Sequence, residues 1–297
     1  MSHPDGQLRL QQPLPRPLQP PQQRPQQQLQ QKLQQPLPLR LVLASNNAKK
    51  LSELRSLLQG LRVQLVSQAE LGITEADEPH CTFIENALAK ARHAAAASGC
   101  AAIADDSGLC VDALDGAPGV ISAHYAPLEI LANPANPANP ANPVNPVSPV
   151  SPVSSVSPVN GAAPPAALPT DREALRRLQD EANNRLLLLR LGAAAAGRGS
   201  PAQAAQPGNG RDASFVCTLV AIRHAQDPQP LVAVGRWSGQ ILKQPRGELG
   251  FGYDPLMFIP GLLMTVAEMD AQTKNLHSHR ARAMAQMQQW LGSVWGL

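Results

Sequence analysis

Residues 101–108, AAIADDSG, place two adjacent carboxylates directly after a short apolar run. Such a run is typical of a buried strand, and the end of a strand is where α/β proteins commonly hold their ligands. Buried neighbouring carboxylates need compensating charge, and their hard oxygens suit Mg²⁺, which in turn suits phosphates. A solvated Asp-Asp-Ser-Gly turn accounts for the same residues equally well, because turns favour these residue types. The stretch therefore leaves a ligand site and a simple turn as two open interpretations.

Apolar periodicity on both sides of this stretch predicts an α/β fold. Five short apolar runs predict strands, at 39–44, 101–104, 109–114, 215–222 and 231–234. Helical spacing of apolar residues predicts four helices, over 51–61, 82–98, 172–191 and 267–294. The last two strands are expected to pair through a turn, which makes the second half of the sheet partly antiparallel.

Low-complexity segments interrupt this pattern. Residues 1–38 are rich in Pro and Gln and are predicted to be disordered, with a docking arm for a partner as the less favoured interpretation. Residues 132–158 repeat Ala-Asn-Pro, Val-Asn-Pro and Val-Ser-Pro, and proline at every third position excludes a helix or a central strand. We expect one domain over 39–297, with low-complexity loops inserted at about 127–170 and about 192–210.

Charge and composition exclude several classes of protein. The net charge of +3 comes almost wholly from residues 1–38, so the remainder lacks the basic stripe that nucleic-acid binding needs. Aromatic residues make up only 3% of the chain, too few for a base-stacking platform. The four cysteines show no zinc spacing and suit a reducing compartment. With no secretory signal and no long apolar span, we expect a cytoplasmic protein that binds neither nucleic acid nor membrane.

A polar segment between the first predicted strand and the first predicted helix is a candidate anion site. A helix start offers free backbone N–H groups and a positive dipole end, and lysine adds a cation suited to phosphate. The spacing is not that of a P-loop, and simple helix capping with solvated lysines is the alternative. The segment consists of Ser45, Asn46, Asn47, Ala48, Lys49 and Lys50.

The start of the second predicted helix carries a capping signal. Thr82 and Glu85 have the spacing of a capping box, which by itself explains Glu85 without a ligand. Asn86 and Lys90 lie four residues apart and therefore share one helix face.

Two further motifs lie near the C-terminus. Residues 250–255, GFGYDP, set glycines around a phenylalanine, which allows close backbone approach and an aromatic face for a planar base. A hairpin turn with aromatic packing is the alternative. Lys274, His277, Ser278, His279 and Arg280 gather donors within a short stretch, although an exposed basic helix face is equally consistent with them.

Taken together and in this order, the motifs resemble those of the inosine/xanthosine triphosphate pyrophosphatases, which hydrolyse non-standard purine nucleoside triphosphates. The resemblance runs from Leu41 to about Leu291 and includes Gly116-Ala117-Pro118-Gly119. The chain departs from the usual family pattern at Asn46, Lys49, His80 and His124.

The resemblance implies an elongated, two-lobed α/β fold with a central mixed β-sheet flanked by helices, a cleft between the lobes and a homodimer. It also implies an enzyme that cleaves ITP, dITP and XTP to the monophosphate and pyrophosphate, with Mg²⁺ as cofactor. A related nucleotide pyrophosphatase of the Maf-like type, or a non-catalytic protein that binds partners through its Pro/Gln arms, are the alternatives.

The resemblance also assigns roles to residues. Asp106 would be the general base and would hold Mg²⁺ together with Glu85, while Ser107 would bind substrate. Lys50 and Lys274 would neutralise phosphate charge. The other residues of the first loop, 45–49, would also bind substrate. The base pocket would be formed by Phe251, Gly252, Tyr253, Asp254, His279 and Arg280.

Overall fold

The computed structural model describes residues 37–46, 48–127, 171–197 and 210–297. The chain divides into two compact units, 1–38 and 39–297, and every helix and strand described below belongs to the second. Among the described helices, none has the length and apolarity needed to cross a membrane.

A single mixed sheet forms the centre of the second unit. Its order is β2-β1-β3-β4-β5-β6-β7, with β1 parallel to β2 and β3 and the remaining neighbours antiparallel. The strands are β1 (Leu39–Leu43), β2 (Val63–Ser67), β3 (Ala101–Val111), β4 (Asp212–Ile222), β5 (Leu231–Ile241), β6 (Met257–Ile259) and β7 (Met264–Thr265). The prediction of an α/β fold with a mixed sheet flanked by helices is confirmed, whereas the two lobes and the cleft stay predictions.

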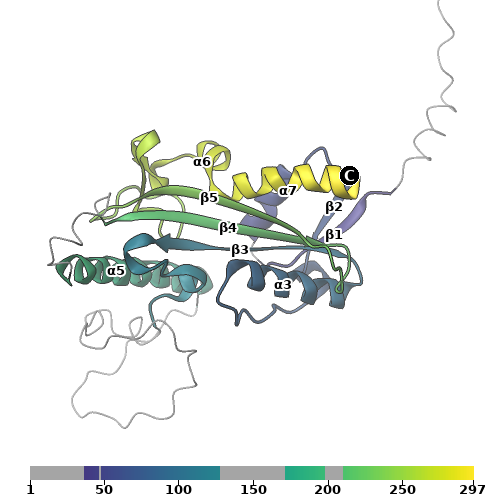
Figure 1. Cartoon of the computed structure of the whole chain (residues 1–297), viewed down its shortest axis with the longest axis horizontal. Helices are drawn as coiled ribbons and strands as arrows, with labels where there is room; N and C mark the ends of the chain where they lie inside the picture. Colours follow the sequence, from purple (N-terminus) through teal and green to yellow (C-terminus); the bar gives the residue numbers. More distant parts are fainter. Residues whose placement is uncertain (1–36, 47, 128–170, 198–209) are drawn as a thin grey trace, which may run out of the picture. The chain divides into compact units, whose positions relative to one another are not determined.

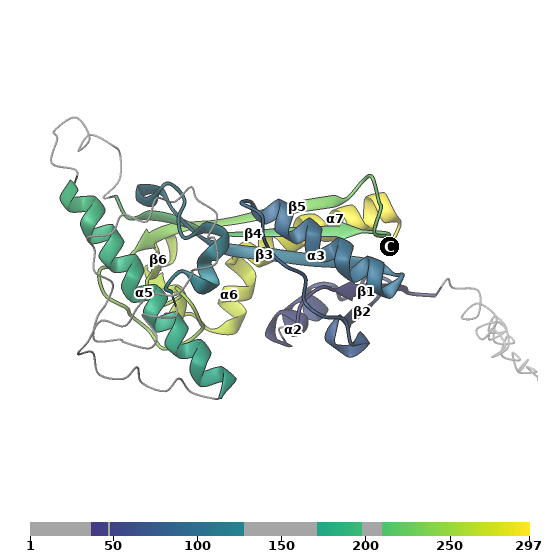
Figure 2. The same ribbon diagram turned by 90° about the horizontal axis from the view of Figure 1, so that it is seen from below.

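Helices cover both faces of this sheet. In Figure 1, α3 lies against one face of β3 and β4, α7 lies against the opposite face, and α5 lies near the far end of β3. Figure 2 shows the same arrangement from below. The helices are α2 (Ala48–Leu57), α3 (Phe83–Ser98), α5 (Arg172–Gly197), α6 (Ala271–His277) and α7 (His279–Trp295). Short 3₁₀ segments are η1 (Ala69–Leu71), η2 (Asp112–Leu114), η3 (Gly119–His124), η4 (Pro260–Leu262) and η5 (Val266–Glu268).

Three apolar clusters hold these layers together. Alanines of α3 pack on Ala102 and Ala104, whereas α2 and α7 pack on the opposite face around Ala101 and Ile103. The third cluster joins α5 to the far halves of the long strands. Successive side chains of β3 point to opposite faces of the sheet, and this alternation continues in the residues that follow Ala104.

The prediction of two separate strands, at 101–104 and 109–114, is wrong, and of the two interpretations left open for the residues between them the turn does not form. Residues 101–111 form one continuous strand, paired with β4 from Ala102↔Ile222 to Val111↔Ala213. An eleven-residue partner strand supplies a complete ladder, so the polar residues keep extended backbone instead of turning. Gly108 is needed here because a Cβ at this position would overlap the Gly119 carbonyl and the Ser122 hydroxyl.

Several helix boundaries also differ from the prediction, and α2 covers Ala48–Leu57 instead of 51–61. The low-complexity loop was expected to begin at about 192, but residues 192–197 continue α5, since the alanines there are strong helix formers. The C-terminal helical region is divided at Ser278, whose extended backbone ends α6 and whose Oγ accepts from the Ala281 N–H to cap α7. The rest of the expected loops, residues 128–170 and 198–209, lies outside the described residues.

Candidate active site

The two adjacent carboxylates lie on opposite faces of β3, just beyond the end of β1. Leu43, the last residue of β1, is paired with Ile103, so Asp105 and Asp106 follow at the carboxyl end of that strand. The residues after β1, including Ser45 and Asn46, leave the sheet at the same place. Asp106 faces the side covered by α3, and Asp105 faces the side covered by α7.

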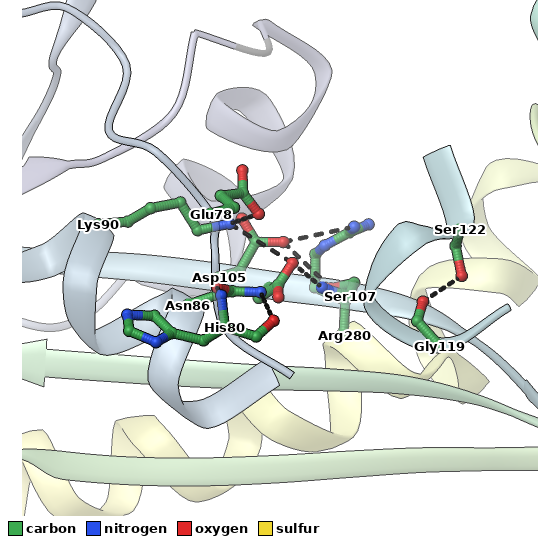
Figure 3. A network of polar contacts seen from close by, with 10 residues as sticks. Glu78, His80, Asn86, Lys90, Asp105, Ser107, Gly119, Ser122 and Arg280 are labelled. Atoms are coloured by element: carbon green, nitrogen blue, oxygen red, sulfur yellow. Dashed lines mark hydrogen bonds and ion pairs between the residues drawn. The ribbon is translucent and has the colours of Figure 1, made fainter. Parts of the chain in front are cut away.

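On the α3 side, one lysine connects two carboxylates. Lys90 Nζ lies 3.4 Å from Asp106 Oδ1. It also lies 3.0 Å from Glu78 Oε2 (Figure 3). The Ser107 N–H also donates to Asp106 Oδ1, at 3.0 Å. Asp106 Oδ2 is buried and has no hydrogen-bond partner within the described residues.

Burial and the neighbouring charges shift the pKa values of Asp106 and Lys90 in opposite directions. Burial raises the pKa of Asp106 above its usual range, and the neighbouring Lys90 only partly opposes the shift. Burial lowers the pKa of Lys90, but the charges of Asp106, Asp105 and Glu78 outweigh it, so the net shift is upward. The pKa values of both groups are thus raised, which favours a charged lysine beside a carboxylate that takes up a proton more readily than an exposed one.

The segment that carries Glu78 is fixed by Asn86. The His80 N–H donates to Asn86 Oδ1 at 3.0 Å, and Asn86 Nδ2 donates to the His80 carbonyl at 3.2 Å (Figure 3). Asn86 and Lys90 thus act from one face of α3, as their spacing predicts. Neither residue was among the expected site residues, although the shared face was the signal that could have found them. Nothing in the sequence pattern marked Glu78.

Glu85, the expected second metal ligand, lies on the exposed first turn of α3. Its N–H donates to Thr82 Oγ1 at 3.3 Å, and the Thr82 hydroxyl donates to Glu85 Oε2 at 2.6 Å. The predicted capping box forms only in part, because the carboxylate accepts from the hydroxyl rather than from the Thr82 backbone N–H. No group of three or more His, Cys, Asp or Glu side chains in the described ranges could hold a metal. The pairing of Glu85 with Asp106 around Mg²⁺ stays a prediction.

On the α7 side, a buried guanidinium faces the other carboxylate. Arg280 Nη2 lies 3.8 Å from Asp105 Oδ2, and Ser107 Oγ donates to the same oxygen at 3.2 Å (Figure 3). Asp105 is 1% exposed. Charge compensation at the Asp-Asp pair is therefore supplied twice, by Lys90 on one face and Arg280 on the other.

The first turn of α7 is brought unusually close to β5. A Cβ at Gly235 would overlap the backbone carbonyl of His279. The His279 ring stacks on Phe215, with centroids 5.1 Å apart. The glycine thus lets His279 and Arg280 approach the sheet.

The aromatic loop 250–255 is held by its own carboxylate. Asp254 Oδ2 accepts from the Phe251 N–H at 3.0 Å and from Lys274 Nζ at 2.6 Å. The Lys274 ammonium also lies 4.6 Å from the centroid of the Phe251 ring, which is part of a side chain 45% exposed. Burial raises the pKa of Asp254, with Lys274 opposing. The loop is thus an organised aromatic and charged surface rather than a plain hairpin turn.

Tyr253 points away from that surface. Its hydroxyl donates to the Ser122 carbonyl at 2.9 Å, and the side chain is buried. Burial raises the pKa of this phenol well above its usual range. The side chain is therefore not part of the exposed surface of the loop, and the role of Tyr253 in substrate binding stays a prediction.

The structure gives less information on the predicted phosphate loop. Ser45 is half-buried and Asn46 is exposed, directly after β1. Asn47 lies outside the described residues, as do the side chains of Ala48, Lys49 and Lys50, whose backbone begins α2. Their role in phosphate binding stays a prediction.

Comparison with known proteins identifies this arrangement. The model of the Ham1 family matches residues 41–140 and 177–290. The dITP/XTP pyrophosphatase of Methylibium petroleiphilum is 53% identical over 257 residues, covering 86% of this chain and 99% of the relative. The dITP/XTP pyrophosphatase of Leptothrix cholodnii is 55% identical over 259 residues, covering 87% and 100%. The solved structure of a HAM1 protein from Coxiella burnetii is 34% identical, with a TM-score of 0.62, and covers 85% of this chain and 98% of that one. The chain belongs to the Ham1 family.

Proposed function

We propose that this protein hydrolyses non-standard purine nucleoside triphosphates, namely ITP, dITP and XTP, to the monophosphate and pyrophosphate. The observation that carries the proposal is the Asp-Asp pair of β3, with Asp106 beside Lys90 on one face and Asp105 beside Arg280 on the other. The names of the two relatives support the same reaction. Its cellular role would be removal of deaminated purines from the nucleotide pool.

The reaction follows from the products. Since pyrophosphate leaves as one unit, water attacks the α-phosphorus, a new P–O bond forms, and the bond to the β-phosphate bridging oxygen breaks. Asp106 accepts the proton of the water, a role suited to a carboxylate whose pKa is raised by burial. Lys90 stays charged beside it and stabilises the negative charge that develops nearby.

The donor chemistry of the site fits Mg²⁺. Asp106 Oδ2 has no partner within the described residues, and Glu85 offers a second, exposed carboxylate. Hard oxygen ligands of this kind suit Mg²⁺, which usually keeps waters and substrate phosphates in its remaining positions. Glu85 and Asp106 would hold the ion, which supplies charge neutralisation for the phosphates.

Base selection is assigned to the other face of β3. His279 and Arg280 begin α7 and offer directional donors, and the Phe251 side chain is exposed. A 6-oxo purine would accept from them, whereas the amino group of adenine would leave buried donors unpaired, which is costly. Lys50 would grip phosphates common to all nucleotides. Lys274, which contacts Asp254 and Phe251, would neutralise phosphate charge as well.

Assembly and location complete the proposal. We assign catalysis to residues 39–297 acting in a cytoplasmic homodimer. Sedimentation of the full chain at several concentrations tests the dimer, and a monomer at all of them contradicts it.

Pyrophosphate release from a panel of nucleotides tests the central claim. The full chain with Mg²⁺ is expected to release pyrophosphate from ITP, dITP and XTP far faster than from ATP, GTP or CTP, and to lose this activity in EDTA. Orthophosphate release instead, or equal rates for all nucleotides, would contradict the proposal.

A further inference from the structure

Helix α5 holds both backbone polar groups of one residue in the aromatic loop. Asp180 Oδ2 accepts from the Gly252 N–H at 2.8 Å, and Asn184 Nδ2 donates to the Gly252 carbonyl at 2.9 Å. The two side chains lie four residues apart and therefore share one helix face. Gly252 has a φ of +62°, a conformation that residues with a Cβ rarely adopt.

The residue held in this way lies between the groups proposed to meet the nucleotide. Phe251 precedes Gly252, and Asp254, whose carboxylate binds Lys274, follows two residues later. A rotation of the Gly252 peptide would turn the exposed Phe251 ring and break the bond from the Phe251 N–H to Asp254. The conformation of Gly252 therefore controls the surface that a planar base would contact.

The packing of α5 does not require these two bonds. The helix buries Ala182, Leu186, Leu187 and Leu191 in the cluster at the far end of the sheet. Asn183 also joins it to the preceding segment by accepting from the Ala126 N–H at 2.8 Å. Because other residues fix the helix, Asp180 and Asn184 act mainly on the loop.

We infer that Asp180 and Asn184 are positioning residues for the nucleotide base, which hold Gly252 so that the aromatic loop is formed before substrate arrives. The inference rests on the proposed function, because it takes the loop to be the base site. A preformed loop spares the ordering entropy that a mobile one would lose on binding, so its effect falls on substrate affinity. In the proposed function neither side chain has a role toward the phosphates or the attacking water.

The experiment compares ITP kinetics of Asp180→Ala with those of Asp180→Asn and Glu181→Ala in the full chain. Asp180→Ala removes the acceptor, and KM for ITP is expected to rise about 10-fold with kcat changed less than about 3-fold. Asp180→Asn keeps an acceptor oxygen and is expected to recover most of the affinity. Glu181 is exposed on the same helix and contacts Arg185, so Glu181→Ala is the matched control and should behave as wild type.

The split between KM and kcat separates positioning from a general structural role. Loss of folded enzyme lowers the apparent kcat and leaves KM unchanged, whereas loss of positioning raises KM. An unchanged KM in Asp180→Ala, or equal KM values in the Ala and Asn variants, overturns the inference. Asn184→Ala provides an independent arm, since it removes the other bond and should also raise KM. Failure of the wild-type enzyme to cleave ITP overturns the proposed function itself, and is thus distinct from failure of the variants.

Discussion

The two faces of β3 at Asp105 and Asp106 differ in how completely their charges are enclosed. Asp105 is 1% exposed, and its compensating Arg280 is also buried. On the other face, Lys90 divides its contacts between Asp106 and the half-exposed Glu78, and one oxygen of Asp106 has no partner within the described residues. Asp105 and Arg280 are both buried, whereas Lys90 joins the buried Asp106 to the half-exposed Glu78.

This difference suggests a division of tasks between adjacent residues. A carboxylate on the more exposed face can bind a ligand or accept a proton, whereas an enclosed ion pair fixes the orientation of its partners. Strand alternation alone separates the two environments, since consecutive side chains point to opposite faces. The predictions below test whether chemistry and base selection divide along the same line.

The largest effect is expected for Asp106→Asn. The change keeps the shape of the side chain but removes the charge and the proton acceptor, so kcat for ITP should fall by roughly 10²-fold or more. Steady-state pyrophosphate release measures it, with circular dichroism to check the fold. Turnover close to that of the wild type would mean that Asp106 has no role in the chemistry.

Arg280→Ala tests the other face. A lost charge-assisted hydrogen bond of about 1.5–3 kcal/mol should lower the ratio of ITP to ATP efficiency by roughly 10- to 150-fold. Lys50→Ala should lower kcat/KM for ITP and for ATP by similar factors, so that their ratio stays nearly fixed.

Measurement of kcat/KM for both nucleotides in each variant is required. Arg280→Lys is the conservative control, because it keeps the charge facing Asp105 but not the planar donor geometry. If Arg280→Ala leaves the ratio of ITP to ATP efficiency unchanged, Arg280 does not select the base and would instead bind phosphate.

The stability of the wild type should depend on pH through Asp106. Burial raises the pKa of Asp106 in the folded state above its value in the unfolded state. Between these two pKa values the folded state binds more protons than the unfolded state, so the fold loses stability as the pH rises, and above both values the charged carboxylate destabilises it. In EDTA at pH 7, Asp106→Asn is therefore expected to melt at a higher temperature than the wild type. The difference should shrink as the pH falls through the raised pKa towards the unfolded value. Thermal unfolding across that pH range measures the difference in Tm. A difference that grows on acidification would contradict the prediction.

The smallest effect is expected for Thr82→Ala. Thr82 caps α3 and donates to Glu85, so its loss should lower the free energy of unfolding by about 1 kcal/mol and the Tm by about 2–4 °C. Base selection should not change, because only the α3 face is altered. Urea unfolding together with the ITP to ATP ratio checks both statements, and a shifted ratio would show that the two faces are coupled.

Much of the fold could be predicted from apolar periodicity. The end of α3 at Gly99 and its start after Thr82 follow from local rules, and the structure confirms both. The continuity of β3 could not be predicted in this way. It depends on β4, more than a hundred residues later, and a local rule reads Asp-Asp-Ser-Gly as a turn.

The candidate site shows the same limit. Asp106 and Ser107 are predicted site residues because of their residue types, and the spacing of Lys90 to Asn86 could have added Lys90. The contact between Asp180 and Gly252 had no local signal, since it joins residues 72 positions apart. Short polar motifs thus indicate the reacting groups, whereas long-range contacts decide how those groups are held.

The close approach at Gly235 has a consequence for protein engineering. This residue lies in the middle of β5, and its effect on Arg280 runs through the backbone of α7. A library that protects only nucleotide-contacting positions would leave codon 235 open to variation. Any side chain introduced there would displace the start of α7, and the clone would be scored as a specificity variant although its nucleotide-facing residues were all intact.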